Sequence, residues 1–123
     1  MHRIAIPFAA ICALSGAALA EEQQDGQLLF NNACRTCHTT DEGDNRLGPN
    51  LHAIVGRKAG SLEGFAYSSS LANADFEWTK DNLDRFLTDP QAMAPGNNMK
   101  PFAGLADEKD RAAIIAFLED QGS

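Results

Sequence analysis

The chain has 123 residues, a length that suits a single domain. It is acidic, with seventeen Asp and Glu against ten Lys and Arg and a formal net charge of −7 at pH 7. This balance argues against nucleic acid or an anionic membrane surface as the main partner.

Residues 1–20 have the features of a secretory signal peptide. Arg3 gives a positive start, residues 4–14 are apolar, and Ala18-Leu19-Ala20 forms an A-x-A cleavage pattern. The apolar run is too short to anchor the chain across a bilayer, and Ile11 before Cys12 disfavours a lipoprotein signal. Residues 21–123 then form the mature domain, without a further stretch long enough to span a membrane. Cleavage removes one basic and no acidic residue, so the mature charge is −8.

The first predicted helix of the mature chain covers residues 25–33 and leads into two cysteines. Four residues at the spacing i, i+3, i+4 and i+7 share one face of this helix and of its continuation: Phe30, Ala33, Cys34 and Cys37. The two thiols therefore lie beside an aromatic ring on an apolar stripe.

Two short helical segments are predicted next. Residues 50–55 form one, ended by Gly56, with three apolar side chains directed inward: Leu51, Ile54 and Val55. Residues 68–73 form a further turn or two. His52 lies on the first segment and is expected to be a partly exposed structural residue rather than a metal ligand.

The next predicted helix begins after Thr79, a good N-cap residue, and runs to about Asp89, where Pro90 stops it. Its apolar face consists of Leu83, Phe86 and Leu87. The loop that follows, residues 89–104, contains three prolines and a Gly-Asn-Asn turn. A loop of this length in a small domain is more often functional than not.

Asp107 can cap the last helix. Its buried side is predicted to comprise Ile114, Ile115, Phe117 and Leu118, whereas Lys109 and Arg111 are expected on its solvent side. No segment alternates apolar and polar residues, so no sheet is expected and the predicted fold class is all-α.

The sequence Cys34-x-x-Cys37-His38 is common to three kinds of site. A redox disulfide of the C-x-x-C type usually follows a strand, and none precedes Cys34. Zinc prefers four well-spaced ligands, which adjacent Cys37 and His38 supply poorly. Covalent attachment of a c-type haem uses both thiols and the histidine, the latter as the proximal iron ligand.

At this point the chain resembles the class I cytochromes c, the small electron carriers that include mitochondrial cytochrome c and bacterial cytochromes c2. The likeness runs from Gly26 to Leu118, through the ordered segments GQLLFNNACRTCH, LGPNLHAIVGRKAG, GFAYSSS, FEWT, PGNNM and AAIIAFL. It implies the small cytochrome c fold, with helices wrapped around one covalently bound haem c and the N- and C-terminal helices in contact.

The resemblance also implies roles for individual residues. Cys34 and Cys37 would hold the haem, and His38 would bind its iron. The carbonyl of Pro49 would accept a hydrogen bond from the Nδ1–H of His38. The expected neighbours of a buried haem propionate are Arg57, Tyr67 and Trp78.

The expected second iron ligand is Met99, which matches the family's P-G-x-x-M pattern, while Met93 matches an apolar core position. Three residues depart from the family. Phe86 stands where many relatives have tyrosine, and Asn97 where threonine is common. One residue more than usual separates Met99 from Phe102.

These observations favour an electron carrier that cycles its iron between Fe(III) and Fe(II), and not an enzyme. The alternatives are a haem enzyme or gas-binding cytochrome with an open sixth iron position, and a docking subunit of a dehydrogenase. We expect a monomer, exported to the bacterial periplasm, that docks transiently with redox proteins at its haem edge. Arg35, Arg46 and Lys100 are expected to form a small positive collar around that edge.

Overall fold

The structure is a computed structural model, and it describes residues 25–121. The elements are an N-terminal helix, described over residues 25–33, and α2 (Ser69–Ala72), α3 (Lys80–Thr88), α4 (Pro90–Met93) and α5 (Glu108–Asp120). Residues 25–121 contain no strand, only an isolated bridge between Lys58 and Glu77. The predicted all-α class is confirmed. The predicted signal peptide, residues 1–20, and Gly122 lie outside the described residues.

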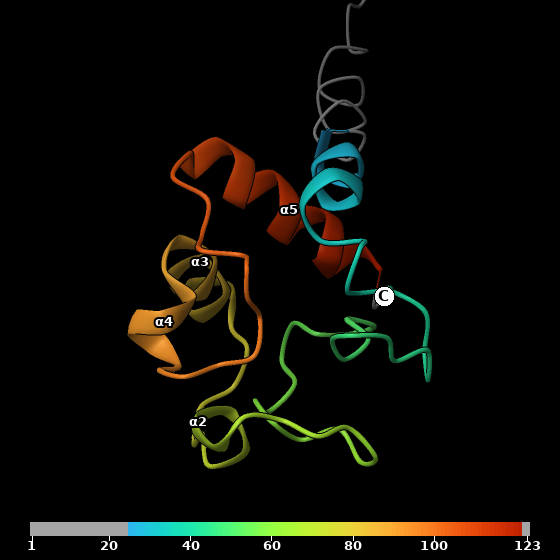
Figure 1. Ribbon diagram of the computed structural model, residues 1–123. Helices are drawn as coiled ribbons and strands as arrows, with labels where there is room; N and C mark the ends of the chain where they lie inside the picture. Colours follow the sequence, from blue (N-terminus) through green and yellow to red (C-terminus); the bar gives the residue numbers. More distant parts are fainter. Residues whose placement is uncertain (1–24, 122–123) are drawn as a thin grey trace, which may run out of the picture.

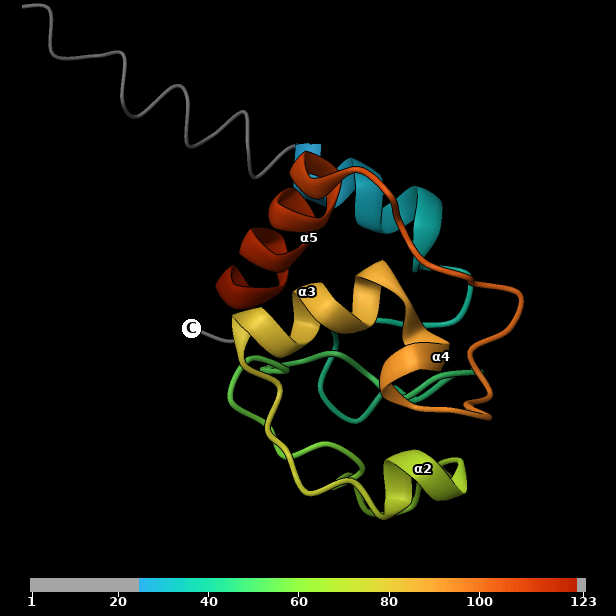
Figure 2. The same ribbon diagram turned by 90° about the vertical axis from the view of Figure 1, so that its left-hand side faces the viewer.

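The N-terminal helix packs against α5, as Figures 1 and 2 both show. Phe30 and Phe117 stack with ring centroids 5.4 Å apart. Gly26 permits the close approach, because a Cβ there would lie 2.2 Å from the carbonyl oxygen of Ala113. The predicted contact between the N- and C-terminal helices is confirmed.

Helix α3 begins and ends close to where the sequence predicts. The Oγ1 of Thr79 accepts a hydrogen bond from the backbone N–H of Asn82, 3.1 Å away, so Thr79 is its cap. Pro90 lies just beyond the helix, but it also opens a second short helix. Its fixed φ suits the first turn of α4, and Asp89 caps α4 through the N–H of Ala92.

The core lies where the three longer helices meet the loops. Helix α3 contacts both α4 and α5, and Figure 2 shows α5 above α3 with α2 at the far end. The buried apolar side chains form one cluster: Phe30, Cys34, Ile54, Ala59, Trp78, Leu83, Phe86, Leu87, Ala94, Ile114, Ile115, Phe117 and Leu118. The four inward residues predicted for α5 all belong to it.

The helix predicted over residues 50–55 is wrong. This segment forms turns, closed by hydrogen bonds three residues apart, from Ile54 N to Leu51 O and from Arg57 N to Ile54 O. Ala53 has a φ of +50°, which no right-handed helix accommodates. The apolar spacing still directs Ile54 into the core and leaves Leu51 and Val55 packed against it.

The expectation that Arg111 lies on the solvent side of α5 is also wrong, because this side chain is buried. Its Nε donates to the carboxylate of Asp84 at 2.8 Å, and its Nη1 donates to the carbonyls of Leu105 and Ala106. The three acceptors compensate for burial of the guanidinium. Lys109 is exposed, as expected.

Candidate functional site

An apolar cavity of about 290 Å³ lies between the loops and the helices. Its walls come from residues 34–71, from Trp78, from α3 and α5, and from residues 98–100. All eight site residues expected from the sequence line it: Cys34, Cys37, His38, Pro49, Arg57, Tyr67, Trp78 and Met99. These eight residues, up to 65 positions apart in the chain (34 to 99), thus line one cavity.

The two cysteines lie at the end of the N-terminal helix, on turns that continue it. The backbone N–H groups of Cys34 and His38 donate to carbonyls four residues earlier, at 2.8 Å and 2.9 Å. Both thiols are free. Burial and the neighbouring Cys37 raise the pKa of the Cys34 thiol to about 11, so this thiol is protonated near neutral pH.

His38 is buried, and its ring is held by a hydrogen bond to the other side of the loop. Its Nδ1 lies 2.7 Å from the carbonyl oxygen of Pro49, the partner that the family resemblance implies. A carbonyl can only accept, so Nδ1 carries the proton and Nε2 is left for a metal. Burial lowers the pKa of the imidazole, and the hydrogen bond to Pro49 opposes this. The ring is therefore held neutral, the form that binds metals.

The two methionines differ in their relation to the cavity. Met99 lines it, whereas Met93, at the end of α4, does not. Both are partly buried against the core cluster. Asn97 is buried near Met99, and its Oδ1 accepts a hydrogen bond from the Met99 backbone N–H at 2.9 Å.

Arg57, Tyr67 and Trp78 lie together on another part of the wall. The Arg57 guanidinium donates to the carbonyls of Asn50, at 2.8 Å, and His52. Burial lowers its pKa from the ordinary arginine value, while Tyr67 acts in the opposite direction. The Tyr67 hydroxyl accepts from the N–H of Leu62, and Trp78 is 8% exposed.

Two of the family departures are visible in the structure. Phe86 lines the cavity and packs edge-on against Trp78, with centroids 5.0 Å apart. It has no hydroxyl for a ligand in the cavity. Phe102 is packed against the core cluster and is not among the cavity-lining residues.

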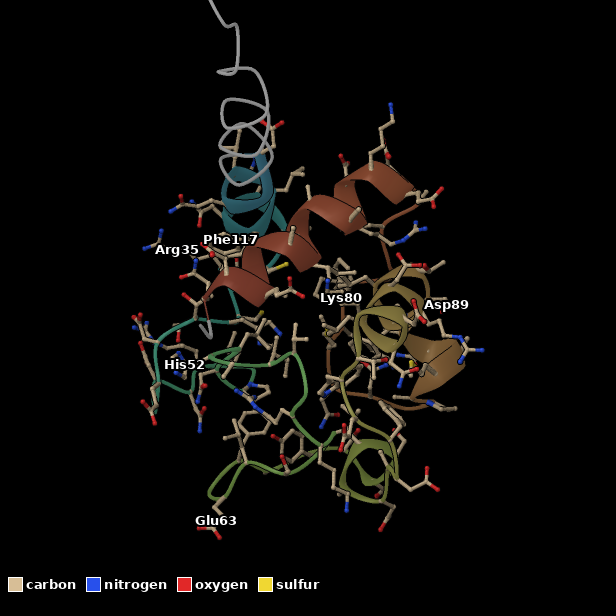
Figure 3. The ribbon with its side chains drawn as sticks, turned by 180° about the vertical axis from the view of Figure 1, so that it is seen from behind. Arg35, His52, Glu63, Lys80, Asp89 and Phe117 are labelled. Carbon is tan, nitrogen blue, oxygen red and sulfur yellow. The ribbon has the colours of Figure 1, made fainter. Side chains whose placement is uncertain are left out.

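His52 does not line the cavity. It lies on the side of the molecule opposite Asp89 and α4 (Figure 3), 3.9 Å from the Glu42 carboxylate. It is partly exposed, as expected. Within residues 25–121, no cluster of three or more His, Cys, Asp or Glu side chains could hold a metal ion.

Sequence reasoning assigned no role to Gly48, Lys58 or Asn98, which also line the cavity. A Cβ on Gly48 would lie 2.4 Å from Cε1 of His38. The signal for Gly48 was its place directly before Pro49. Nothing in the local sequence pointed to Lys58 or Asn98, because their positions depend on how the loops fold back.

Of the three basic residues predicted to surround the haem edge, one lines the cavity. Lys100 is exposed and lines the cavity. Arg46 is next to the lining residue Leu47, but its Nε and Nη2 donate to the Asp44 carboxylate, at 2.8 Å and 3.1 Å. Arg35 lines a separate polar groove beside the N-terminal helix. The basic residues on the cavity wall are Arg57, Lys58 and Lys100.

Comparison with known proteins identifies relatives over most of the chain. Residues 21–118 match the family model described as "Cytochrome C oxidase, cbb3-type, subunit III". The chain is 43% identical to cytochrome c of Stellaria longipes over 100 residues, which is 80% of this chain and 92% of that protein. It is 43% identical to cytochrome c2 iso-2 of Magnetospirillum fulvum over 86 residues, 70% of this chain and 88% of that one. It is also 39% identical to the cytochrome c-type cyt cy of Rhodobacter capsulatus, covering 83% of this chain but only half of that protein.

Proposed function

The chain belongs to the class I cytochromes c, and from this premise we propose that it carries electrons on one haem c ligated by His38 and Met99. Members of this family are electron carriers rather than enzymes and hold one haem c covalently. A haem c supplies one-electron chemistry, because its iron alternates between Fe(III) and Fe(II).

One observation carries the proposal: the thiols, the imidazole and one thioether line the same apolar cavity. The residues present also fit the group. Cys34 and Cys37 are free thiols one helical turn apart, which can form two thioethers on one edge of a ring. Gly48 leaves the His38 ring a space that any side chain would fill.

His38 is the proposed proximal ligand. Its Nδ1–H is directed to Pro49, so its Nε2 lone pair is available for iron. The hydrogen bond fixes the tautomer and the ring orientation. Because the imidazole is buried and its pKa is lowered, no proton competes strongly for Nε2 near neutral pH.

Met99 is the proposed second ligand, and a thioether ligand would favour the reduced state of the iron. If His38 and Met99 both bind the iron, no coordination site would be open to a substrate. This favours electron transfer over the alternative of a haem enzyme or gas-binding cytochrome. Arg57, Tyr67 and Trp78 are the proposed neighbours of a haem propionate.

The proposed setting is the bacterial periplasm, reached through the signal peptide of residues 1–20. Among the described residues, no helix is both long and apolar enough to cross a membrane. Donor and acceptor proteins would dock transiently with a monomer at the cavity mouth. The mass of the mature holoprotein tests the export: it should correspond to a chain that begins at Glu21, and an uncleaved chain would contradict it.

Substitution of the two methionines tests the ligand assignment. Met99→Ala should leave the haem attached through Cys34 and Cys37 but remove the weak band near the red end of the ferric spectrum. The reduction potential should fall, and cyanide or imidazole should bind. Met93→Ala is the matched control, since it removes a thioether that does not line the cavity.

The opposite pattern, with Met93→Ala opening the site, would show that the wrong methionine was assigned. Rapid binding of carbon monoxide to the unaltered protein would instead support the alternative with an open sixth position. Visible spectra and ligand titrations of the three holoproteins distinguish these outcomes.

A further inference from the structure

Asn97 is among the most deeply buried side chains described, with 2% of its surface exposed. Its chain neighbours Gly96 and Asn98 are exposed. Burial of a carboxamide is unfavourable unless its donors and acceptor are hydrogen-bonded. An asparagine at this depth in an otherwise exposed turn therefore has a specific set of partners.

Both ends of the carboxamide bind the backbone of the same loop. The Nδ2 of Asn97 donates to the carbonyl of Ala94 at 3.0 Å, and its Oδ1 accepts from the N–H of Met99 at 2.9 Å. The backbone N–H of Asn97 also donates to Ala94, at 3.1 Å. Since Ala94 is itself buried in the core, the side chain connects Met99 to a fixed point.

Asn97 acts on the cavity only through the backbone. It is absent from the cavity wall, whereas Met99, two residues later, forms part of it. An asparagine that accepts from the N–H two residues ahead forms a local turn that serine and threonine reproduce more weakly. Asn97 therefore determines how residue 99 leaves the turn and enters the cavity.

We propose that Asn97 is a positioning residue whose carboxamide holds the Met99 thioether in place as an iron ligand. The inference rests on the proposed axial role of Met99. Without the Asn97 oxygen, the Met99 N–H loses its partner, and the 94–99 turn gains conformations in which the sulphur has left the cavity. The open fraction of the sixth position then rises.

The rate of cyanide binding to the ferric holoprotein measures that open fraction, because cyanide can bind the iron only after the Met99 sulphur has left it. Asn97→Ala removes both carboxamide bonds and should raise the second-order rate constant about ten-fold, equivalent to about 1.4 kcal/mol. Asn97→Thr keeps a neutral hydroxyl oxygen that can accept from the Met99 N–H, although more weakly than the carboxamide. It should accelerate cyanide binding less than Asn97→Ala, by about three-fold, equivalent to about 0.7 kcal/mol.

Thr79→Ala is the control for stability alone. It removes the cap of α3, a change that typically destabilises a protein by an amount similar to the loss of one buried hydrogen bond. Thr79 does not line the cavity. Its cyanide rate should therefore match that of the unaltered protein, and its red-end absorption band should persist.

The series separates this inference from the ligand assignment. If Met99→Ala removes the red-end band but Asn97→Ala binds cyanide no faster than Thr79→Ala, Asn97 is not a positioning residue. Equal acceleration in Asn97→Thr and Asn97→Ala would likewise overturn it, because the acceptor oxygen would not matter. If Met99→Ala leaves the band intact, it is the proposed ligand that fails. Should Asn97→Ala not fold, Asn97→Thr decides: a cyanide rate equal to that of Thr79→Ala would overturn the inference.

Discussion

At the scale of single residues, Gly48 shows how a missing side chain shapes the site. A Cβ at this position would lie 2.4 Å from Cε1 and 2.7 Å from Nδ1 of His38. The imidazole is 6% exposed and bonded to Pro49, so it has little room to move away. Glycine is required here for space, since its φ is an ordinary one.

Gly48→Ala should displace the His38 ring and weaken its hydrogen bond to Pro49. Overpacking of this kind costs about 1–3 kcal/mol of unfolding free energy, and the proton NMR shifts of the haem methyl groups should change with the ring orientation. Gly43→Ala is the control: its Cβ would meet nothing within 4 Å, although its φ of +77° imposes a backbone cost of about 1 kcal/mol. Unchanged haem shifts in Gly48→Ala would contradict the steric account.

At the scale of elements, two ion pairs join α3 to the C-terminal part of the chain. Arg111 of α5 meets Asp84 at 2.8 Å, with side-chain exposures of 10% and 44%. Lys80 meets Glu119 at the same distance, but with exposures of 62% and 47%. The two pairs contribute unequally despite their equal distances. Water screens the largely exposed Lys80–Glu119 pair, whereas the half-buried Arg111–Asp84 pair is screened less.

Arg111→Met should therefore lower the unfolding free energy by about 2 kcal/mol, since it also leaves the carbonyls of Leu105 and Ala106 without their donor. Lys80→Met removes the exposed pair between the same two helices and should cost less than about 0.5 kcal/mol. Unfolding of the two holoproteins by urea, which is uncharged and does not screen ion pairs, measures both. Similar losses in the two variants would mean that burial does not separate these pairs.

At the scale of the whole molecule, charge is distributed unevenly. The chain is acidic overall, yet the charged residues on the cavity wall are the basic residues Arg57, Lys58 and Lys100. The interfaces between redox proteins are small and short-lived, so charged residues act mainly on the rate of association. Of the predicted collar of Arg35, Arg46 and Lys100, only Lys100 lines the cavity, where the other basic residues are Arg57 and Lys58.

A partner that docks at the cavity mouth beside Lys100 should be acidic there. At low ionic strength, Lys100→Glu should slow second-order electron transfer by a factor on the order of ten or less. Lys109→Glu makes the same charge change on an exposed lysine of α5 away from the cavity and should have a smaller effect. Added salt should reduce the difference, because screening acts over about 8 Å at physiological strength. Faster transfer in Lys100→Glu would indicate a basic partner.

Features that depend on near neighbours along the chain could be predicted from the sequence. Apolar periodicity placed the N-terminal helix, α3 and α5, and the caps Thr79 and Asp107 marked two helix starts. The spacing of Cys34, Cys37 and His38 predicted one shared site. Such features follow from contacts within about four residues, which helical geometry makes readable along the chain.

Features that depend on distant partners could not be predicted from the sequence and became visible in the folded chain. Arg111 is buried because Asp84, 27 residues away, accepts from it. Residues 50–57 form turns rather than a helix, with Arg57 bonding back to the carbonyls of Asn50 and His52. Lys58 reaches the cavity wall and Arg35 does not. Burial and long-range hydrogen bonds outweigh local propensity at these positions, because they act only once the chain has folded.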